Sequence, residues 1–180
     1  MRKIFLLMNV SLDGFFEASE HDISGFKSDF EAFSAGAGGE VDGLLFGHRT
    51  YEMMKFWRTP EAQQMAPQIA AFMNATPKYV ASHQPFDPEW DNVTVLSGDV
   101  IEAVQQLKAS SGSTIGIFGS NQLCVSLMQH KLIDEFQIIV NPVVFGAGTA
   151  LFTGLPQKTE LTLKTSRQFQ SGAVMLIYHP

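Results

Sequence analysis

Cysteine, basic residues and long apolar runs are scarce in this 180-residue sequence, and each shortage excludes a class of protein. The single cysteine, Cys124, allows no disulfide within the chain. The longest apolar runs, at residues 4–8 and 138–140, are far shorter than the roughly 20 residues that cross a bilayer, so no membrane association is predicted. There are 12 Lys and Arg against 18 Asp and Glu, and the net charge of −6 without any basic run argues against nucleic acid as a partner.

Several catalytic motifs are also missing. The five histidines form neither a His-x-His nor a His-Glu-x-x-His pair, and one cysteine cannot form a cluster, so no metal site is predicted. The phosphate-binding motif Gly-x-x-x-x-Gly-Lys-Ser/Thr and the Gly-x-Ser-x-Gly elbow are absent, which removes the main support for a kinase or a serine hydrolase. No signal-peptide h-region follows the first residues, and we expect a cytoplasmic protein.

The residues that are present predict one folded domain over residues 1–180. Apolar residues make up 45% of the chain, which includes 15 Phe, and this composition excludes a disordered protein. Apolar runs typical of buried strands occur at residues 3–10, 44–46, 79–81, 93–96, 114–118 and 136–140, with a closing hairpin at 161–164 and 174–178. Helical patterns occur at residues 29–35, 50–57, 61–73, 100–107 and 120–129. This order predicts an α/β sandwich with a mostly parallel central sheet and an antiparallel C-terminal hairpin.

Small, hydroxyl and basic residues gather where the predicted strands end. Gly47, Arg49 and Thr50 follow one strand, Ser82 follows a second, and Gly119–Asn121 follow a third. Ligands of open α/β sheets bind outside the carboxyl ends of the strands. A glycine at a helix start lets backbone N–H groups approach an anion closely, and the helix dipole favours negative charge there. Two such helix starts predict the site of a phosphorylated dinucleotide.

Each of these features also has a purely structural explanation. Gly47–Thr50 is typical of a capped helix, Gly119–Asn121 is typical of a turn, and Arg49 suits a solvated surface. Their joint placement after successive strands is what favours a binding site. Residues 146–151 begin like a Rossmann fingerprint but lack its third glycine, and the residues that follow cannot open a long helix. We interpret them as a Gly-rich loop able to lie close to a ligand.

Five segments share a pattern with one known family: Ser11–Gly14, Asp42–Glu52, Phe118–Asn121, Leu132–Phe136 and Asn141–Gly148. In this order they resemble the dihydrofolate reductase superfamily, and within it the reductase domain of bacterial riboflavin biosynthesis. The resemblance implies a dihydrofolate-reductase-like three-layer sandwich, NADPH as cofactor, and hydride transfer to a nitrogen heterocycle. The implied acceptor resembles 5-amino-6-(5-phosphoribosylamino)uracil, a pterin or a related ring. A homodimer is implied as well.

The resemblance also implies roles for individual residues. Gly47, Arg49 and Thr50 match contacts to the adenosine-side phosphate and the pyrophosphate. Ser82 matches a contact to the ribose 2′-phosphate, which with Arg49 favours NADPH over NADH. The loop that contacts the pyrophosphate is matched by Gly119, Ser120 and Asn121.

Two carboxylates are candidate catalytic residues, because reduction of a ring C=N bond adds hydride to carbon and also needs a proton at nitrogen. Asp13 matches an acidic position at the active-site mouth of riboflavin-type reductases, although Asp-Gly is also an ordinary turn pair. Asp29 falls near the position of the buried carboxylate of dihydrofolate reductases. A charge in the first turn of a helix explains Asp29 equally, and we favour that explanation.

Phe15 and Phe16 depart from the family pattern, since a Lys or Arg usually follows the Ser-x-Asp-Gly motif. Two aromatic residues suit a flat, uncharged ring better than a phosphoribosyl group. Together with Trp57 and Phe145 they are candidates for the ring pocket, although aromatic residues more often belong to a core. Two alternatives stay open: a non-catalytic relative that binds a nucleotide or flavin-like ligand, and a purely structural oligomer.

Overall fold

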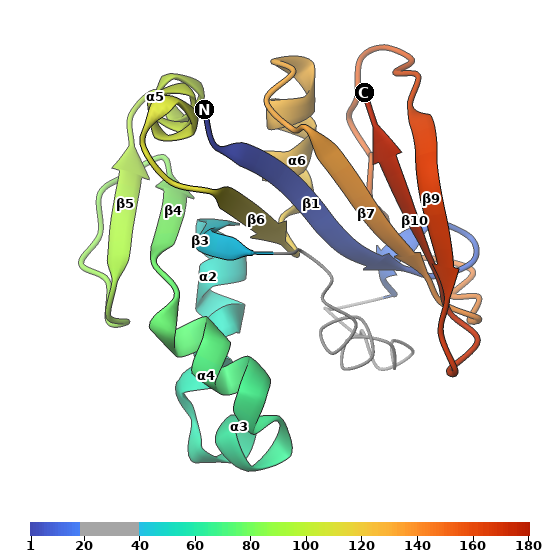
Figure 1. Ribbon diagram of the computed structural model, residues 1–180, viewed down its shortest axis with the longest axis horizontal. Helices are drawn as coiled ribbons and strands as arrows, with labels where there is room; N and C mark the ends of the chain where they lie inside the picture. The colour runs from blue at the N-terminus through green and yellow to red at the C-terminus, as the bar shows by residue number, and fades with distance from the viewer. Residues whose placement is uncertain (19–39) are drawn as a thin grey trace.

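The computed structural model describes residues 1–18 and 40–180, and its centre is an eight-stranded sheet (Figure 1). Its strands are β1 (Lys3–Val10), β3 (Val41–Gly47), β4 (Lys78–Ser82), β5 (Val93–Ser97), β6 (Thr114–Phe118), β7 (Glu135–Val140), β9 (Thr162–Gln168) and β10 (Val174–His179). They lie in the order β5-β4-β3-β6-β1-β7-β10-β9. The strands from β5 to β7 in this order pair in parallel, whereas β10 pairs antiparallel with both β7 and β9.

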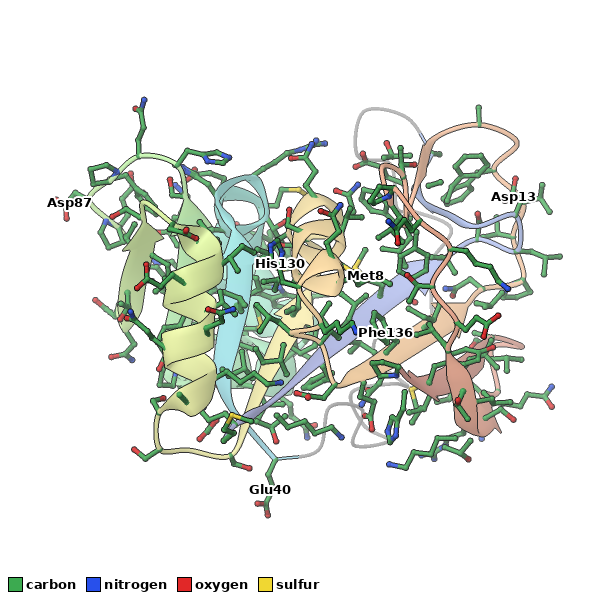
Figure 2. All side chains as sticks on the ribbon, turned by 90° about the horizontal axis from the view of Figure 1, so that it is seen from above. Met8, Asp13, Glu40, Asp87, His130 and Phe136 are labelled. Atoms are coloured by element: carbon green, nitrogen blue, oxygen red, sulfur yellow. The ribbon has the colours of Figure 1, made fainter. Side chains whose placement is uncertain are left out.

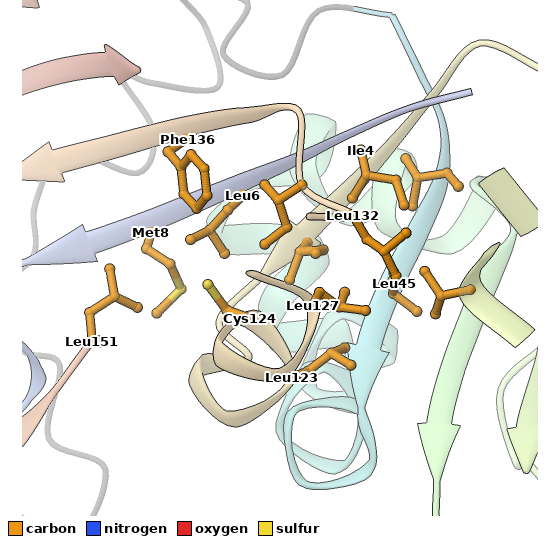
Figure 3. Close-up of a cluster of buried hydrophobic side chains, with 14 of the residues drawn as sticks. Ile4, Leu6, Met8, Leu45, Leu123, Cys124, Leu127, Leu132, Phe136 and Leu151 are labelled. Atoms are coloured by element: carbon orange, nitrogen blue, oxygen red, sulfur yellow. The ribbon is translucent and has the colours of Figure 1, made fainter. Parts of the chain in front are cut away.

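Helices cover both faces of this sheet. They are α2 (His48–Met54), the 3-10 helix η1 (Lys55–Arg58), α3 (Pro60–Met65), α4 (Pro67–Ala75), α5 (Val100–Ala109) and α6 (Asn121–Gln129). On one face, Leu127 of α6 joins the core formed with Leu6 of β1 (Figure 3). Val104 of α5 belongs to the same core. On the other face, Tyr51 of α2 and Met73 of α4 form a second core with β3 and β4. The predicted α/β sandwich with a mostly parallel sheet and an antiparallel hairpin is confirmed.

Residues 61–73 form two helices instead of the single helix that the sequence analysis predicts. α3 ends at Met65 and α4 begins at Pro67, and Ala66 between them has φ −147° and ψ 71°. Proline has no backbone N–H to donate and keeps the residue before it out of the helical region. The prediction of one helix is therefore wrong at Pro67, where the helical hydrogen bonding of α3 has ended and α4 begins as a separate helix.

A second, two-stranded sheet forms where the sequence analysis predicts only a loop. β2 (Phe15–Glu17) pairs antiparallel with β8 (Thr149–Ala150). Gly148, just before β8, has φ +145°, and a Cβ there would lie 2.1 Å from the Glu17 carbonyl oxygen. Only glycine tolerates that contact and that backbone conformation. Gly148 thus approaches the chain's own backbone.

Asp29 and the helix predicted at residues 29–35 lie outside the described residues. Across residues 1–18 and 40–180, no helix has both the length and the apolar character that crossing a membrane requires.

A buried carboxylate joins four strands at the amino end of β7. The Lys3 ammonium donates to Glu135 at 2.8 Å, the Gln137 amide donates to it at 2.7 Å, and His179 Nε2 lies 3.1 Å away. Lys164 lies 3.5 Å from the same carboxylate. Burial by itself raises the pKa of Glu135, but the hydrogen bonds from Lys3, Gln137 and His179 outweigh it and lower the pKa to about 2. The ionised carboxylate is therefore a stabilising group.

Replacing this carboxylate should weaken the fold in a pH-dependent way. We expect Glu135→Gln to lower the free energy of unfolding by about 2 kcal/mol at neutral pH, because hydrogen bonds to a charged group are lost. A pKa lowered in the folded state stabilises above the unfolded value of 4.5 and loses its effect as pH falls toward about 2. Urea unfolding at neutral and at acidic pH measures the gap in the free energy of unfolding between the wild-type protein and Glu135→Gln. Glu160→Gln, at an exposed side chain, is the control, and a gap that does not narrow in acid would contradict the assignment.

Candidate functional site

A cavity of about 1180 Å³ opens at the carboxyl ends of β1, β3, β4 and β6. Pockets for small ligands commonly measure roughly 300–1,000 Å³, so this one has room for a dinucleotide together with a second ring. Every residue predicted to bind the cofactor lines it: Gly47, Arg49, Thr50, Ser82, Gly119, Ser120 and Asn121. The structure brings these residues together, and their role in binding stays a prediction.

Two hydrogen bonds join the starts of α2 and α6 at this cavity. The Gly47 N–H donates to Ser120 Oγ at 3.0 Å, and Thr50 Oγ1 donates to the Gly119 carbonyl at 3.2 Å. Neither helix start has a side-chain cap, and the N–H groups of a first turn have no partner within their own helix. Such N–H groups, together with the helix dipoles, favour an anion.

Gly119 shapes the turn between β6 and α6. Its φ of +75° is rare for residues with a side chain, and a Cβ there would lie 3.3 Å from Thr50 Cγ2 and 3.5 Å from Met54 Cε. Its N–H donates to Met8 Sδ at 3.1 Å, which ties the turn to β1. Glycine therefore keeps both the backbone turn and the space beside α2.

Ser82 and His48 form a polar contact on the β4 side of the cavity. The buried Ser82 Oγ donates to the Gln84 carbonyl at 2.7 Å, and His48 Nδ1 lies 3.2 Å from Ser82 Oγ. The His48 ring stacks on Phe86, with centroids 4.4 Å apart and planes at 29°. No role is predicted for His48 from sequence, although its place between Gly47 and Arg49 is a usable signal. A ligand oxygen reaching Ser82 would also meet this imidazole.

Glu17 is a further cavity residue that the sequence analysis missed. This buried carboxylate on β2 accepts a hydrogen bond from Thr149 Oγ1 at 2.8 Å. It also lies 3.5 Å from the Arg49 guanidinium, whose side chain is 63% exposed. Arg49 is therefore held at the cavity but remains open to solvent, as a side chain that meets an incoming phosphate should be.

Asp13 lies apart from this arrangement. It is exposed, lies at the opposite end of the molecule from Asp87 in Figure 2, and is not among the described residues that line the cavity. Its carboxylate accepts the backbone N–H groups of Phe145 and Gly146 at 3.1 Å and 2.8 Å. A hydrogen bond from Ser11, followed by these two N–H groups, lowers the pKa of Asp13 below its ordinary value. Asp13 thus holds the loop after β7 through these two backbone N–H groups.

The predicted ring-pocket residues divide into two groups. Phe16 and Trp57 line the cavity. Phe15 and Phe145 do not appear among its described lining residues. The residues of the Gly-rich segment 146–151 are likewise outside that lining, so their expected closeness to a ligand is not what the described structure shows.

The left-handed backbone at Gly119 leads to a prediction about the effect of a side chain there on stability. We expect Gly119→Ala to lower the free energy of unfolding by about 1 kcal/mol or more, because alanine is strained at positive φ. Gly47→Ala is the matched control: Gly47 has φ −75°, and its added Cβ would come no closer than 3.7 Å to Ser120 Oγ. Urea unfolding measures both variants. Equal losses in the two would contradict a special requirement at Gly119.

Comparison with known proteins agrees with this architecture. The family model described as the RibD C-terminal domain matches residues 2–175. Two proteins of Bacillus subtilis (strain 168) are similar over nearly their whole length. The uncharacterized protein YwjB is 33% identical over 181 residues, covering 98% of this chain and 97% of its own. The uncharacterized protein YyaP is 28% identical over 180 residues, covering 99% of this chain and 95% of its own.

Solved structures show the same fold. A putative riboflavin biosynthesis protein from Shewanella sp. PV-4 superposes with a TM-score of 0.79 at 21% identity, and the match covers 98% of each chain. A diaminohydroxyphosphoribosylaminopyrimidine deaminase/5-amino-6-(5-phosphoribosylamino)uracil reductase from Thermotoga maritima superposes with a TM-score of 0.73 at 13% identity, over 99% of this chain and 56% of its own. Because the family model matches the chain over nearly its full length, the chain belongs to the RibD C-terminal domain family.

Proposed function

We propose that this protein is an NADPH-dependent reductase that transfers hydride to a nitrogen heterocycle. The observation that carries the proposal is the convergence of all seven predicted cofactor residues on one large cavity at the carboxyl edge of the sheet. Membership of the RibD C-terminal domain family supports it. A structural neighbour from Thermotoga maritima is named as a 5-amino-6-(5-phosphoribosylamino)uracil reductase, which supports an acceptor of that general type.

The residues present fit a phosphorylated dinucleotide. The starts of α2 and α6 would hold the pyrophosphate, with Gly47, Gly119 and Ser120 leaving the backbone open to close approach. Arg49, exposed beside Glu17, would hold the 2′-phosphate with Ser82. The bound cofactor supplies the hydride, so the protein's task is to position the acceptor and exclude competing reactions.

The source of the proton stays a prediction, with Asp13 and Asp29 as the candidates from sequence. Asp13 already accepts two backbone N–H groups of the loop after β7, and its pKa is lowered, foremost by the hydrogen bond from Ser11. A carboxylate of this kind remains ionised near neutral pH and is a poor general acid there. The homodimer and the cytoplasmic location, both implied at the level of sequence, belong to the proposal in the same way.

Cofactor titration tests the proposal directly. We expect NADPH to raise the melting temperature and quench tryptophan fluorescence, with NADH binding more weakly. Arg49→Ala should weaken NADPH binding about tenfold or more, because a charge-assisted contact is lost, and should affect NADH less. Arg58→Ala is the control, since Arg58 is exposed on η1 and is not among the described lining residues. If neither nucleotide binds the wild-type protein, the reductase proposal fails.

Binding alone does not establish turnover. NADPH oxidation should therefore be followed against a series of pterins and aminouracils. Oxidation with at least one ring supports the reductase, whereas tight NADPH binding without oxidation by any of them would favour the non-catalytic relative.

The same assay separates a loop-holding role of Asp13 from proton delivery. We expect Asp13→Asn to lower kcat by less than about tenfold, because the loop loses hydrogen bonds but no proton donor is removed. Asp29→Asn, measured alongside, tests the second candidate. A loss of about a hundredfold or more in Asp13→Asn, with a changed pH profile, would instead identify Asp13 as the proton donor.

A further inference from the structure

Glu17 places a buried carboxylate inside a cavity that is proposed to bind a cofactor with several phosphate groups. Asp99 is the other carboxylate among the described lining residues. It accepts the Glu102 N–H at 3.0 Å and so caps the start of α5, which explains its place. Glu17 caps no helix and lies where the phosphates of the cofactor are expected. A charge that opposes the proposed ligand therefore needs an explanation of its own.

The second sheet holds the Glu17 carboxylate at the cavity. Glu17 and Thr149 are paired residues of β2 and β8. Thr149 Oγ1 also donates to Glu17 Oε1 at 2.8 Å. Strand pairing and a side-chain hydrogen bond together restrict this carboxylate to one wall of the cavity, and because it is buried, water and salt screen its charge only weakly.

Arg49 is a cation that faces this carboxylate from α2. Its guanidinium lies 3.5 Å from Glu17 Oε1, the oxygen that also accepts from Thr149, and 63% of the Arg49 side chain is exposed. An ion pair this open to solvent on one side is weak. A phosphate can meet a guanidinium through two short hydrogen bonds at once. Phosphate is therefore the stronger partner for Arg49.

The contact between Glu17 and Arg49 has two opposite consequences for an incoming phosphate. A tight pair would orient the guanidinium and help binding. A loose pair hinders binding, because the carboxylate and the phosphate compete for the same guanidinium. The 3.5 Å distance and the exposure of Arg49 leave the guanidinium poorly oriented, whereas the buried carboxylate stays in place as the phosphate arrives. Competition is the larger effect.

We propose that Glu17 is a specificity-determining residue, a resident counter-ion that the 2′-phosphate of the cofactor must displace from Arg49. This rests on the proposed function, which gives Arg49 to the 2′-phosphate. NADH has no phosphate at that position and leaves the contact between Glu17 and Arg49 intact. Glu17 therefore lowers the affinity for NADPH more than the affinity for NADH, and it narrows the preference that Arg49 creates.

Glu17→Gln tests the exchange, because the amide keeps the size of the side chain and an oxygen for Thr149 but removes the charge. We expect this variant to bind NADPH about fivefold more tightly than the wild-type protein, and NADH less than about twofold more tightly. Calorimetric titration of the full chain with each nucleotide measures both affinities. NADPH affinity that is unchanged or weaker overturns the proposal, since Glu17 would then orient Arg49 or have no effect on it. An equal gain for NADH overturns it as well.

A double-mutant cycle shows whether Glu17 acts through Arg49. In the Arg49→Ala background, Glu17→Gln should raise the NADPH affinity by less than about twofold, because no guanidinium remains to be released. A full fivefold gain in that background would show direct repulsion of the phosphate by Glu17 and would overturn the exchange.

Glu61→Gln is the matched control. It removes the same charge from an exposed side chain on α3 that is not among the described lining residues, and it should leave both affinities unchanged. Thermal melts show whether each variant is folded. If NADPH binds neither the wild-type protein nor Glu17→Gln, the proposed function fails and the role of Glu17 fails with it. If NADPH binds but Glu17→Gln does not tighten it, only the role of Glu17 fails.

Discussion

β1 is buried on both faces, and the positions of the helices and the cavity follow from that constraint. It pairs in parallel with β6 on one side and β7 on the other, so that Leu6 lies level with Ile117 and Phe136. Parallel neighbours require crossover connections, and a strand with two apolar faces requires cover on both. The carboxyl ends of the parallel strands consequently meet at one edge. Gly47, Ser82 and the turn after β6 are neighbours at that edge because of strand direction, before any side chain contributes.

Patterns that depend on local spacing were sufficient to predict this framework from sequence. The apolar run at residues 114–118 corresponds to β6 residue for residue, because a strand buried on both faces has a continuous apolar pattern. Asp99 accepts from the Glu102 N–H at 3.0 Å and begins α5 where a cap is expected. The break at Pro67 was equally available from sequence, but a helical pattern on both sides concealed it.

What could not be predicted depends on contacts between distant segments. Glu17 becomes a cavity residue because it meets Thr149 and Arg49, which are 132 and 32 positions away in the chain. The pairing of β2 with β8 involves segments too short to have a periodicity of their own. The place of Ser82 follows from strand direction, yet its contact with His48 depends on how α2 begins. The sequence therefore predicts which residues reach the cavity better than it predicts what each one touches there.

The close approach of Gly148 to the Glu17 carbonyl gives the cavity a distant determinant of its shape. Any side chain at position 148 would displace β2. Glu17 would move with β2, and its contact with Arg49 would change. The segment between β7 and β8 thus acts as a spacer that sets where β2, and with it Glu17, lies at the cavity. Variation among relatives in that spacer would alter access to the cavity without changing one residue of its lining.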